Sequence, residues 1–312
     1  ISFAGLLQLF FLYRFVKKYY ALNFDFKIKI TNKVKFFFKK LLPSIFSSGV
    51  TQINILVGTI IASFQASAVS YLYYSDRIAQ LPLGIIGVAL GTALLPSLSK
   101  LETEKKDTLV KHHLEKSFVL GCIFSIPASI AFLIIPEILI EAIFARGAFI
   151  ESHVKNVALA LTAYGLGVPA FIGIKVFQSS FFAMRDTSTP FKISLFSVAL
   201  NIILSVVLMR NFGFFGIALA TSIASYFALS IYYFLLIKID RISFNVLKQF
   251  LKLILLGLVF AFVLFQIPSF FIKLNIILSL TLIIFISVLF WFTLMILFKF
   301  IDFVSIKKAL TF

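Results

Sequence analysis

The sequence is poor in the residues that most catalytic and metal sites need. It has one cysteine, one tryptophan, three histidines and only 12 acidic residues among 312. Cys122 alone can form neither an internal disulfide nor a cysteine-based metal cluster. The motifs GxxxxGK[ST], HExxH and CxxC are absent, which excludes a P-loop nucleotide site and the zinc and redox sites built on the other two. We therefore expect a protein that is not an enzyme.

Apolar residues dominate what is present. Hydrophobic residues make up 61% of the chain and charged residues 13%, and the mean hydropathy is +1.07. A globular domain of this composition would be insoluble, so we predict an all-α polytopic membrane protein whose surroundings are membrane lipids. The net charge of +17 does not indicate a nucleic-acid partner, because the basic residues lie in short loops between apolar segments.

Window hydropathy predicts about eight transmembrane helices, each near the roughly 20 residues that a bilayer requires. They are expected at 41–65, 68–98, 117–142, 154–183, 190–210, 214–237, 249–269 and 276–298. Residues 1–13 are apolar but too short to span, and because they show no initiator methionine and no charged region leading to a cleavage site, we do not predict a signal peptide here. We expect them to be the tail of a preceding helix, in the later part of a longer protein.

The segment from Arg14 to Lys40 is basic, with apolar residues between its charges, as in FKIKITNKVKFFFKK. It suits an amphipathic segment on an anionic leaflet, and equally an ordinary cytoplasmic loop. Placing it in the cytoplasm puts 23 of the 29 Lys and Arg on that side and four on the other. The positive-inside rule then predicts that both ends of the chain are cytoplasmic.

The stretch from Tyr71 to Lys100 carries an ionisable pair, Asp76 and Arg77, inside an otherwise apolar segment. Charges at membrane depth are tolerated mainly where they face a bundle interior or a water-filled cavity, so the pair predicts a functional site on a transport path. Four further residues predict a helix that bends and packs closely against a neighbour. They are Pro82, Gly84, Gly87 and Gly91.

Other polar residues within the spans have two interpretations. Gln52, Asn54, Asn201 and Ser205 suit hydrogen bonds that join helices in lipid, and they could also serve a site. Lys175 follows several helix-disturbing glycines and a proline. It could extend toward the interface, but a cation on a broken helix is also how anion sites are built in membranes.

Two stretches resemble the MurJ (MviN) family of lipid II flippases. From Pro43 to Lys100 the chain contains ASF, YYSDR, LPLG, GVALGT and LLPSLS in the order and at the spacing of that family. YGLGVPAFIGIKVFQSSFFAMRDTSTPFKI, from Tyr164 to Ile193, matches its pattern as well. The last two spans match only in hydropathy.

The resemblance implies a fold of the multidrug/oligosaccharidyl-lipid/polysaccharide exporter type, with two bundles of six helices and two extra carboxy-terminal helices. The eight spans would be helices 7–14 of 14. Residues 1–40 would then be the end of a preceding helix and a basic loop, residues 41–238 the second six-helix bundle, and residues 239–312 the two extra helices and a cytoplasmic tail.

The resemblance further implies alternating access in the bacterial inner membrane. Lipid II would enter a cationic cavity from the cytoplasmic leaflet and leave toward the periplasm. Arg77 is the position that matches the family's cavity cation, with Asp76 as a partner that orients or neutralises a neighbour, and our hypothesis extends to Lys175. Because the family's first half is absent, we expect this chain to be inactive alone.

We expect no cofactor, with transport coupled to membrane potential or to a monovalent cation. Asn54, Asn201 and Thr221 could line a sodium site, although there is no carboxylate among them. One alternative function is another polysaccharide-unit or drug exporter of the same superfamily. Another is a non-transporting scaffold that recruits cell-wall synthesis proteins through its basic loops, which predicts tolerance of changes at Arg77.

Overall fold

The computed structural model describes residues 2–19, 31, 34–35, 49, 52–271 and 275–300. The chain divides into two units, Ile1–Leu42 and Pro43–Phe312, which are described separately. In the first unit, α1 (Ser2–Tyr19) is a helix with exposed apolar side chains and two lysines in its last turn. Most of the basic segment expected between Arg14 and Lys40 lies outside the described residues.

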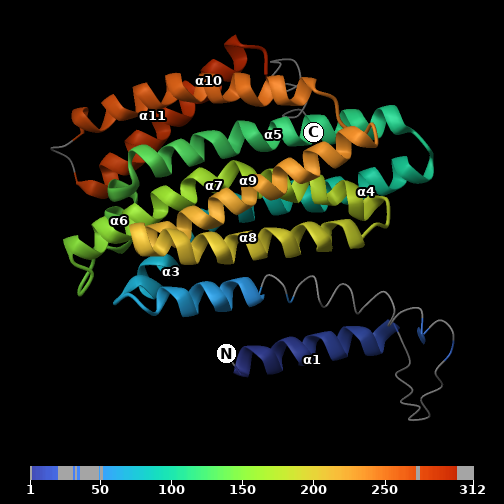
Figure 1. Cartoon of the computed structure of the whole chain (residues 1–312), viewed down its shortest axis with the longest axis horizontal. Coiled ribbons are helices and arrows are strands. Elements are labelled where there is room, and N and C mark those ends of the chain that lie inside the picture. Colours follow the sequence, from blue (N-terminus) through green and yellow to red (C-terminus); the bar gives the residue numbers. More distant parts are fainter. Residues whose placement is uncertain are drawn as a thin grey trace. The chain divides into compact units, whose positions relative to one another are not determined.

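Every element described in the second unit is helical (Figure 1), which confirms the all-α prediction. After a helix at Gln52–Ala62, the elements are α3 (Ala68–Pro82), a π-helical turn (Leu83–Gly87), α4 (Val88–Thr103), α5 (Asp107–Ile134), α6 (Pro136–Phe144), α7 (Glu151–Ala183), α8 (Ser188–Phe212), α9 (Phe214–Lys238), α10 (Asn245–Gln266), a 3₁₀ turn (Ile267–Phe270) and α11 (Ile276–Leu297).

Seven helical segments among the described residues are long and apolar enough to cross a membrane. α3, the π turn and α4 form one of them together, and the others are α5, α7, α8, α9, α10 with its 3₁₀ turn, and α11. They correspond to seven of the eight predicted spans. The eighth prediction, residues 41–65, begins outside the described residues, and only the short helix Gln52–Ala62 represents it.

The predicted span 117–142 is wrong in extent. α5 begins ten residues earlier, at Asp107, and ends at Ile134, while the rest of the predicted span belongs to the short helix α6. The break falls at Ile135, whose φ of −124° and ψ of 37° are not helical. Pro136 explains this, because a proline ring disfavours the helical conformation in the residue before it.

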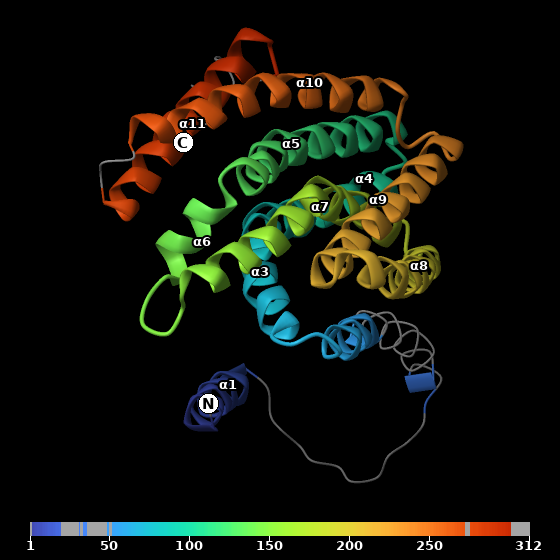
Figure 2. The same cartoon turned by 60° about the vertical axis from the view of Figure 1, so that its left-hand side comes forward.

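α7 is the central helix of the second unit. It packs against α3, α4, α5, α6 and α9 (Figure 2). Of its most apolar 18 residues 67% are buried, against 17% to 56% in the other six membrane-length segments. α10 and α11 lie further out, where α10 packs on α5 and α11 packs on α6 and α10.

Small residues allow the neighbours to approach α7 closely. Its buried positions include Ala158, Ala160, Ala163, Gly165, Gly167, Ala170, Gly173 and Ser179. A Cβ added at Gly167 would lie 2.6 Å from the hydroxyl oxygen of Ser222 on α9. One added at Gly173 would lie 2.9 Å from side-chain carbons of Phe118 on α5 and Leu229 on α9. Helices in lipid associate through close van der Waals contact, so these small residues fix the bundle.

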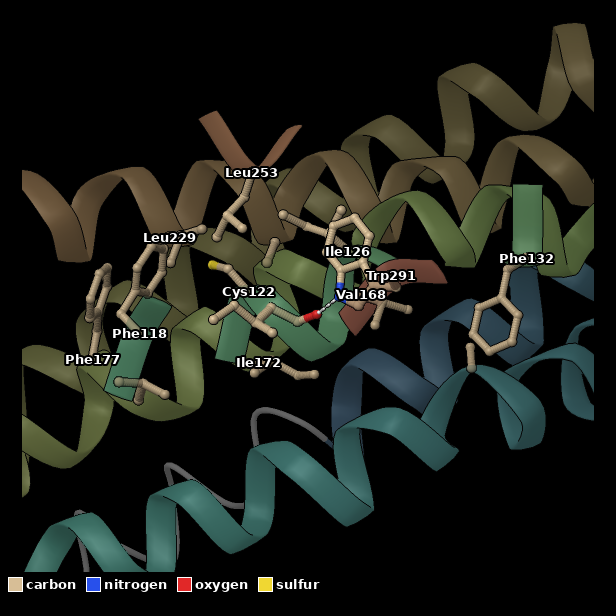
Figure 3. Close-up of a cluster of buried hydrophobic side chains, with 14 of the residues drawn as sticks. Phe118, Cys122, Ile126, Phe132, Val168, Ile172, Phe177, Leu229, Leu253 and Trp291 are labelled. Carbon is tan, nitrogen blue, oxygen red and sulfur yellow. Dashed lines mark hydrogen bonds between the residues drawn. The ribbon is translucent and has the colours of Figure 1, made fainter. Parts of the chain in front are cut away.

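α11 is joined to this core by its tryptophan. Trp291 is 2% exposed, and its indole Nε1 donates a hydrogen bond of 2.8 Å to the carbonyl of Ile123 on α5 (Figure 3). Its ring also packs edge-on against Phe260 of α10. An indole N–H in an apolar interior needs an acceptor, so this bond sets where α11 meets α5.

Ion pairs connect the α4–α5 turn with the α9–α10 turn at one end of the second unit. The Arg241 guanidinium, after α9, contacts Glu102 at 2.8 Å and Asp107 at 2.6 Å. Lys111 donates to Asp240 at 2.5 Å, and this hydrogen bond lowers the pKa of the Asp240 carboxyl. The α4–α5 and α9–α10 turns therefore share one end, as the predicted helix order requires.

The packing around α7 gives a direct prediction. We expect Gly167→Ala to lower the free energy of unfolding by about 1–3 kcal/mol, because the added methyl group overpacks the contact with Ser222. The matched control is Gly84→Ala, since no atom lies within 4 Å of a Cβ at Gly84. The control is expected to be neutral or stabilising by up to about 1 kcal/mol. The measurement is thermal unfolding of the purified protein in detergent, and equal melting temperatures for the two variants would contradict this packing.

Candidate transport site

The α3–α4 segment bends at a π-helical turn. Pro82 ends α3 and offers no backbone N–H, and the N–H of Val88 then bonds to the carbonyl of Leu83, five residues earlier. Figure 2 shows the helix changing direction between α3 and α4. Beyond the turn the segment packs on α7, where a Cβ at Gly87 would meet Ile172 at 3.4 Å and one at Gly91 would meet the Ser179 hydroxyl oxygen at 3.6 Å. The bend thus lets α3 and α4 both pack on α7 while running in different directions.

Gly84 does not share this packing. It is exposed, and a Cβ built on it has no atom within 4 Å. Of the three glycines predicted to pack closely against a neighbour, Gly87 and Gly91 therefore meet α7, and the prediction is wrong for Gly84.

Arg77 is an exposed cation on α3. Its guanidinium lies 4.7 Å from the centre of the Tyr73 ring, one turn earlier on the same helix. A stacked arginine keeps its donors free at the edges of its plane, where they can bind an anion in a bidentate manner. Among the described residues no carboxylate forms a salt bridge with Arg77.

Asp76 forms its hydrogen bond with a different residue of α3. Its carboxylate accepts a hydrogen bond from the side-chain amide of Gln80, one turn further on. Asp76 is only partly exposed and lines a pocket of about 220 Å³ between helices. The two charges adjacent in sequence thus serve different surfaces of the second unit.

The pocket beside Asp76, called the polar pocket below, collects polar side chains from five helices. Asn54 comes from the helix Gln52–Ala62, Asp76 and Gln80 from α3, Tyr164 from α7, Asn201 from α8 and Thr221 from α9. The predicted cation-site residues are therefore brought together, and a carboxylate joins them.

Asn201 is the centre of the hydrogen bonds in the polar pocket. Its amide nitrogen donates to the Asn54 side-chain oxygen at 2.8 Å. Its own side-chain oxygen accepts from the hydroxyls of Thr221 and Ser205, both at 3.4 Å. Three helices are joined by this cluster, as expected for polar residues in lipid.

The polar pocket has side-chain oxygens of the kinds that bind a monovalent cation, and they come from several residues. Asn54, Asn201 and Thr221 supply neutral oxygens, and Asp76 supplies the negative charge. The neutral oxygens already take part in hydrogen bonds with one another, so a cation would have to displace some of those bonds. The part of the chain that the structure describes contains no group of three His, Cys, Asp or Glu side chains suited to a metal ion.

Lys175 lies on α7, away from the polar pocket. It is exposed, and no described carboxylate forms a salt bridge with it. It comes eleven residues after Tyr164, about three helical turns, so the two residues share one face of α7 roughly 16 Å apart. This face therefore runs from the polar pocket to an isolated cation.

Three residues of the site were missed from the sequence. Tyr73 and Gln80 each lie four residues from the charge they contact, a spacing that places them on the same helix face, and it could have identified both. Tyr164 lines the pocket from α7 and had no such signal, because its proximity to Asp76 depends on tertiary packing.

A bundle of membrane-length helices with a polar pocket, and with exposed cations that have no salt-bridge partner among the described residues, is typical of membrane transport proteins. The model of the family described as lipid II flippase MurJ matches residues 1–296, and the chain belongs to this family. The family and the seven apolar helices indicate a multi-pass inner-membrane protein. The identification rests on sequence along nearly the whole chain.

Curated relatives carry the name "Probable lipid II flippase MurJ". The protein of Rickettsia prowazekii (strain Madrid E) is 38% identical over 234 residues, which are 74% of this chain and 45% of that protein. The protein of Rhizobium meliloti (strain 1021) is 38% identical over 198 residues, covering 64% and 37%. The chain thus spans about half or less of the length of these relatives.

Solved structures agree with the family. "Lipid II flippase MurJ, inward closed conformation" superposes with a TM-score of 0.71 and 29% identity, over 87% of this chain and 56% of that chain. An outward-facing multidrug resistance MATE family transporter of the MOP superfamily gives a TM-score of 0.56 at 17% identity, over 74% and 53%. The second likeness shows the fold alone.

The Asn54–Asn201 hydrogen bond can be measured with a double-mutant cycle. We expect Asn54→Ala and Asn201→Ala each to destabilise the protein, and the double variant to be little worse than Asn201→Ala. The expected coupling energy is about 0.6–1.7 kcal/mol, the range for hydrogen bonds between membrane helices. The measurement is unfolding of the four proteins under one condition, and additive effects would contradict a direct bond between α8 and the helix Gln52–Ala62.

Proposed function

We propose that this chain is part of a lipid II flippase, which moves the lipid-linked peptidoglycan precursor from the cytoplasmic to the periplasmic leaflet by alternating access. Its contribution would be a cation-bearing wall of the transport cavity, without catalysis. The observation that carries the proposal is Arg77, a stacked guanidinium with no salt bridge to any described carboxylate, on a membrane-length helix of a lipid II flippase family member.

The depth of Arg77 supports this role. Arg77 comes nine residues after the start of α3, about 13 Å along the helix, in a bilayer whose apolar core is about 30 Å thick. An unpaired charge at that depth is costly unless water or a charged ligand meets it. The pyrophosphate of lipid II is such a ligand, because its oxygens accept the paired donors of a guanidinium.

Lys175 extends the same wall. Its exposed ammonium on α7 offers a second cation in an apolar setting. An ammonium is a compact charge without a fixed plane, which suits phosphate or carbohydrate oxygens approaching from several directions. We assign it a substrate contact secondary to that of Arg77.

The bend between α3 and α4 suits alternating access. The π turn and α4 meet α7 closely at Gly87 and Gly91, and α3, which also packs on α7, carries Asp76 and Arg77 before the turn. A π turn after a proline is a place where a helix can change its angle without losing all its hydrogen bonds. We propose that α3 moves relative to α4 about this turn during transport.

This chain covers only part of the length of its relatives, and this limits the transport activity that we expect of it alone. Because it spans about half their length, we propose that it supplies one half of the cavity and does not transport lipid II by itself. The Lys and Arg bias supports a cytoplasmic location for the turns that join α4 to α5 and α9 to α10. Cell-wall synthesis proteins are possible partners at that side.

The polar pocket is proposed as the site of cation coupling. Asn54, Asn201 and Thr221 would offer neutral oxygens to a sodium ion, and Asp76 would balance its charge. Occupancy of the pocket would then bias the angle of α3, since Asp76 and Arg77 are on the same helix.

Arg77 is tested with the intact gene in cells depleted of their own flippase. We expect Arg77→Ala to reach normal membrane levels, to fail in growth rescue, and to lower outward accessibility of lipid II by about 10- to 100-fold, the effect of losing one charge-assisted contact. The control is Arg210→Ala, which removes an exposed arginine at the end of α8 and should rescue growth fully. Full rescue by Arg77→Ala would instead favour the scaffold alternative.

Cation coupling is tested by thermal unfolding in NaCl and in N-methyl-D-glucamine chloride. Sodium at ten times its dissociation constant should stabilise the wild type by about 1.4 kcal/mol, through preferential binding to the folded state. Asp76→Asn should lose this sodium-specific stabilisation while remaining folded. Equal melting temperatures of the wild type in the two salts would remove the polar pocket from the coupling mechanism.

A further inference from the structure

A second polar depression lies at the end of the second unit where α5 and α10 begin and α11 ends. It has a volume of about 400 Å³ and is called the cationic groove below. Three lysines line it, Lys116 from α5, Lys252 from α10 and Lys299 just after α11. The groove is separate from the polar pocket, and it shares no lining residue with it.

The lysines of the cationic groove differ from the other basic residues at this end. Arg241 and Lys111 are paired with carboxylates across the turns. No described carboxylate is within salt-bridge distance of Lys116, Lys252 or Lys299. Three positive charges therefore converge on one groove, against one carboxylate, Glu115, among its lining residues.

The acidic residue of the groove is already engaged. Glu115 lines it, but its Oε1 accepts a hydrogen bond of 2.7 Å from the backbone N–H of Ser243. His112 and Gln249 add side chains that can hydrogen-bond to an oxyanion. The donors of the groove thus outnumber its free acceptors, which is the composition of an anion site.

Aromatic rings hold one of the lysines in place. The Lys252 ammonium lies 5.2 Å from the centre of the Phe300 ring and 5.7 Å from that of Phe298. Such contacts are worth about 0.5–1 kcal/mol at an exposed site and restrict where the ammonium can go. The cation is therefore positioned over the groove while its N–H donors remain available.

The level of the groove favours a lipid headgroup over a soluble anion. Lys252 comes seven residues into α10, about 10 Å along the helix, and the floor of the groove is made of Val119, Leu120 and Ile123 of α5. Cations next to an apolar floor at the end of membrane-length helices match the layer where phosphates and acyl chains meet. The Lys and Arg bias places this end at the anionic cytoplasmic leaflet.

We propose that the cationic groove binds the phosphate of an anionic phospholipid from the cytoplasmic leaflet. The phosphate oxygens accept from Lys116, Lys252 and Lys299, and the acyl chains lie along α5 and α10. A lipid held there joins α5, α10 and the end of α11, and it does so whether or not the chain takes part in flipping.

The test uses the full chain in nanodiscs of phosphatidylcholine, with and without phosphatidylglycerol. Native mass spectrometry counts retained phosphatidylglycerol, and thermal unfolding measures protection. Lys252→Gln with Lys299→Gln should weaken phosphatidylglycerol binding by about 25-fold, about fivefold for each lysine. The matched control is Lys238→Gln with Lys248→Gln, which removes the same charge from exposed lysines outside the groove and should leave binding unchanged.

Further variants test the same proposal if the variant Lys252→Gln with Lys299→Gln fails to fold. Lys116→Gln alone should weaken binding by about fivefold, and Lys252→Arg with Lys299→Arg should retain it. Equal losses in the groove pair and the control pair would overturn the proposal, because they would reflect the charge of the whole surface. Protection by inorganic phosphate in pure phosphatidylcholine, with none from phosphatidylglycerol, would overturn the assignment to a lipid.

Discussion

The close approach of neighbouring helices to α7 is the constraint on which the rest of the second unit depends. Hydrophobic burial does little to bring helices together in lipid, so the bundle relies on van der Waals contact that small residues permit. Gly167 and Gly173 admit α9 and α5, and Gly87 and Gly91 bring the start of α4 against the same helix. α7 therefore fixes the positions from which the side chains of the site project.

The position of the candidate transport site depends on which helix surfaces remain accessible after this packing. α3 and α4 both pack on α7, and the bend after Pro82 gives these two parts of one membrane-length segment different directions. Asp76 lines the pocket with Asn201, whereas Arg77 stacks on Tyr73 and forms no salt bridge with a carboxylate of the described residues. One helix thus presents an anion to a possible cation site and a cation to a possible anionic substrate.

Most of the membrane-length helices could be predicted from the sequence, because length and hydropathy identify them. The site at Asp76 and Arg77 could be predicted because charged residues are rare within such segments. The predicted extent of the span at 117–142 was wrong. A hydropathy average does not detect a helix break of one residue, such as the break at Ile135 that Pro136 causes. The grouping of Asn54, Asn201 and Thr221 was predicted, whereas the arrival of Asp76 and Tyr164 at the same pocket depends on packing between helices distant in sequence, which no local pattern contains.

The central claim is that Arg77 on α3 and Lys175 on α7, both exposed cations, line an aqueous path in the intact protein. Cysteine accessibility tests it directly, and the native Cys122 gives little background because it is 2% exposed. Tyr73→Cys and Lys175→Cys should react with a water-soluble maleimide in membranes, whereas Phe262→Cys, on an apolar exposed face of α10, should not. Labelling of Phe262→Cys alone, or of none of the three, would contradict the account.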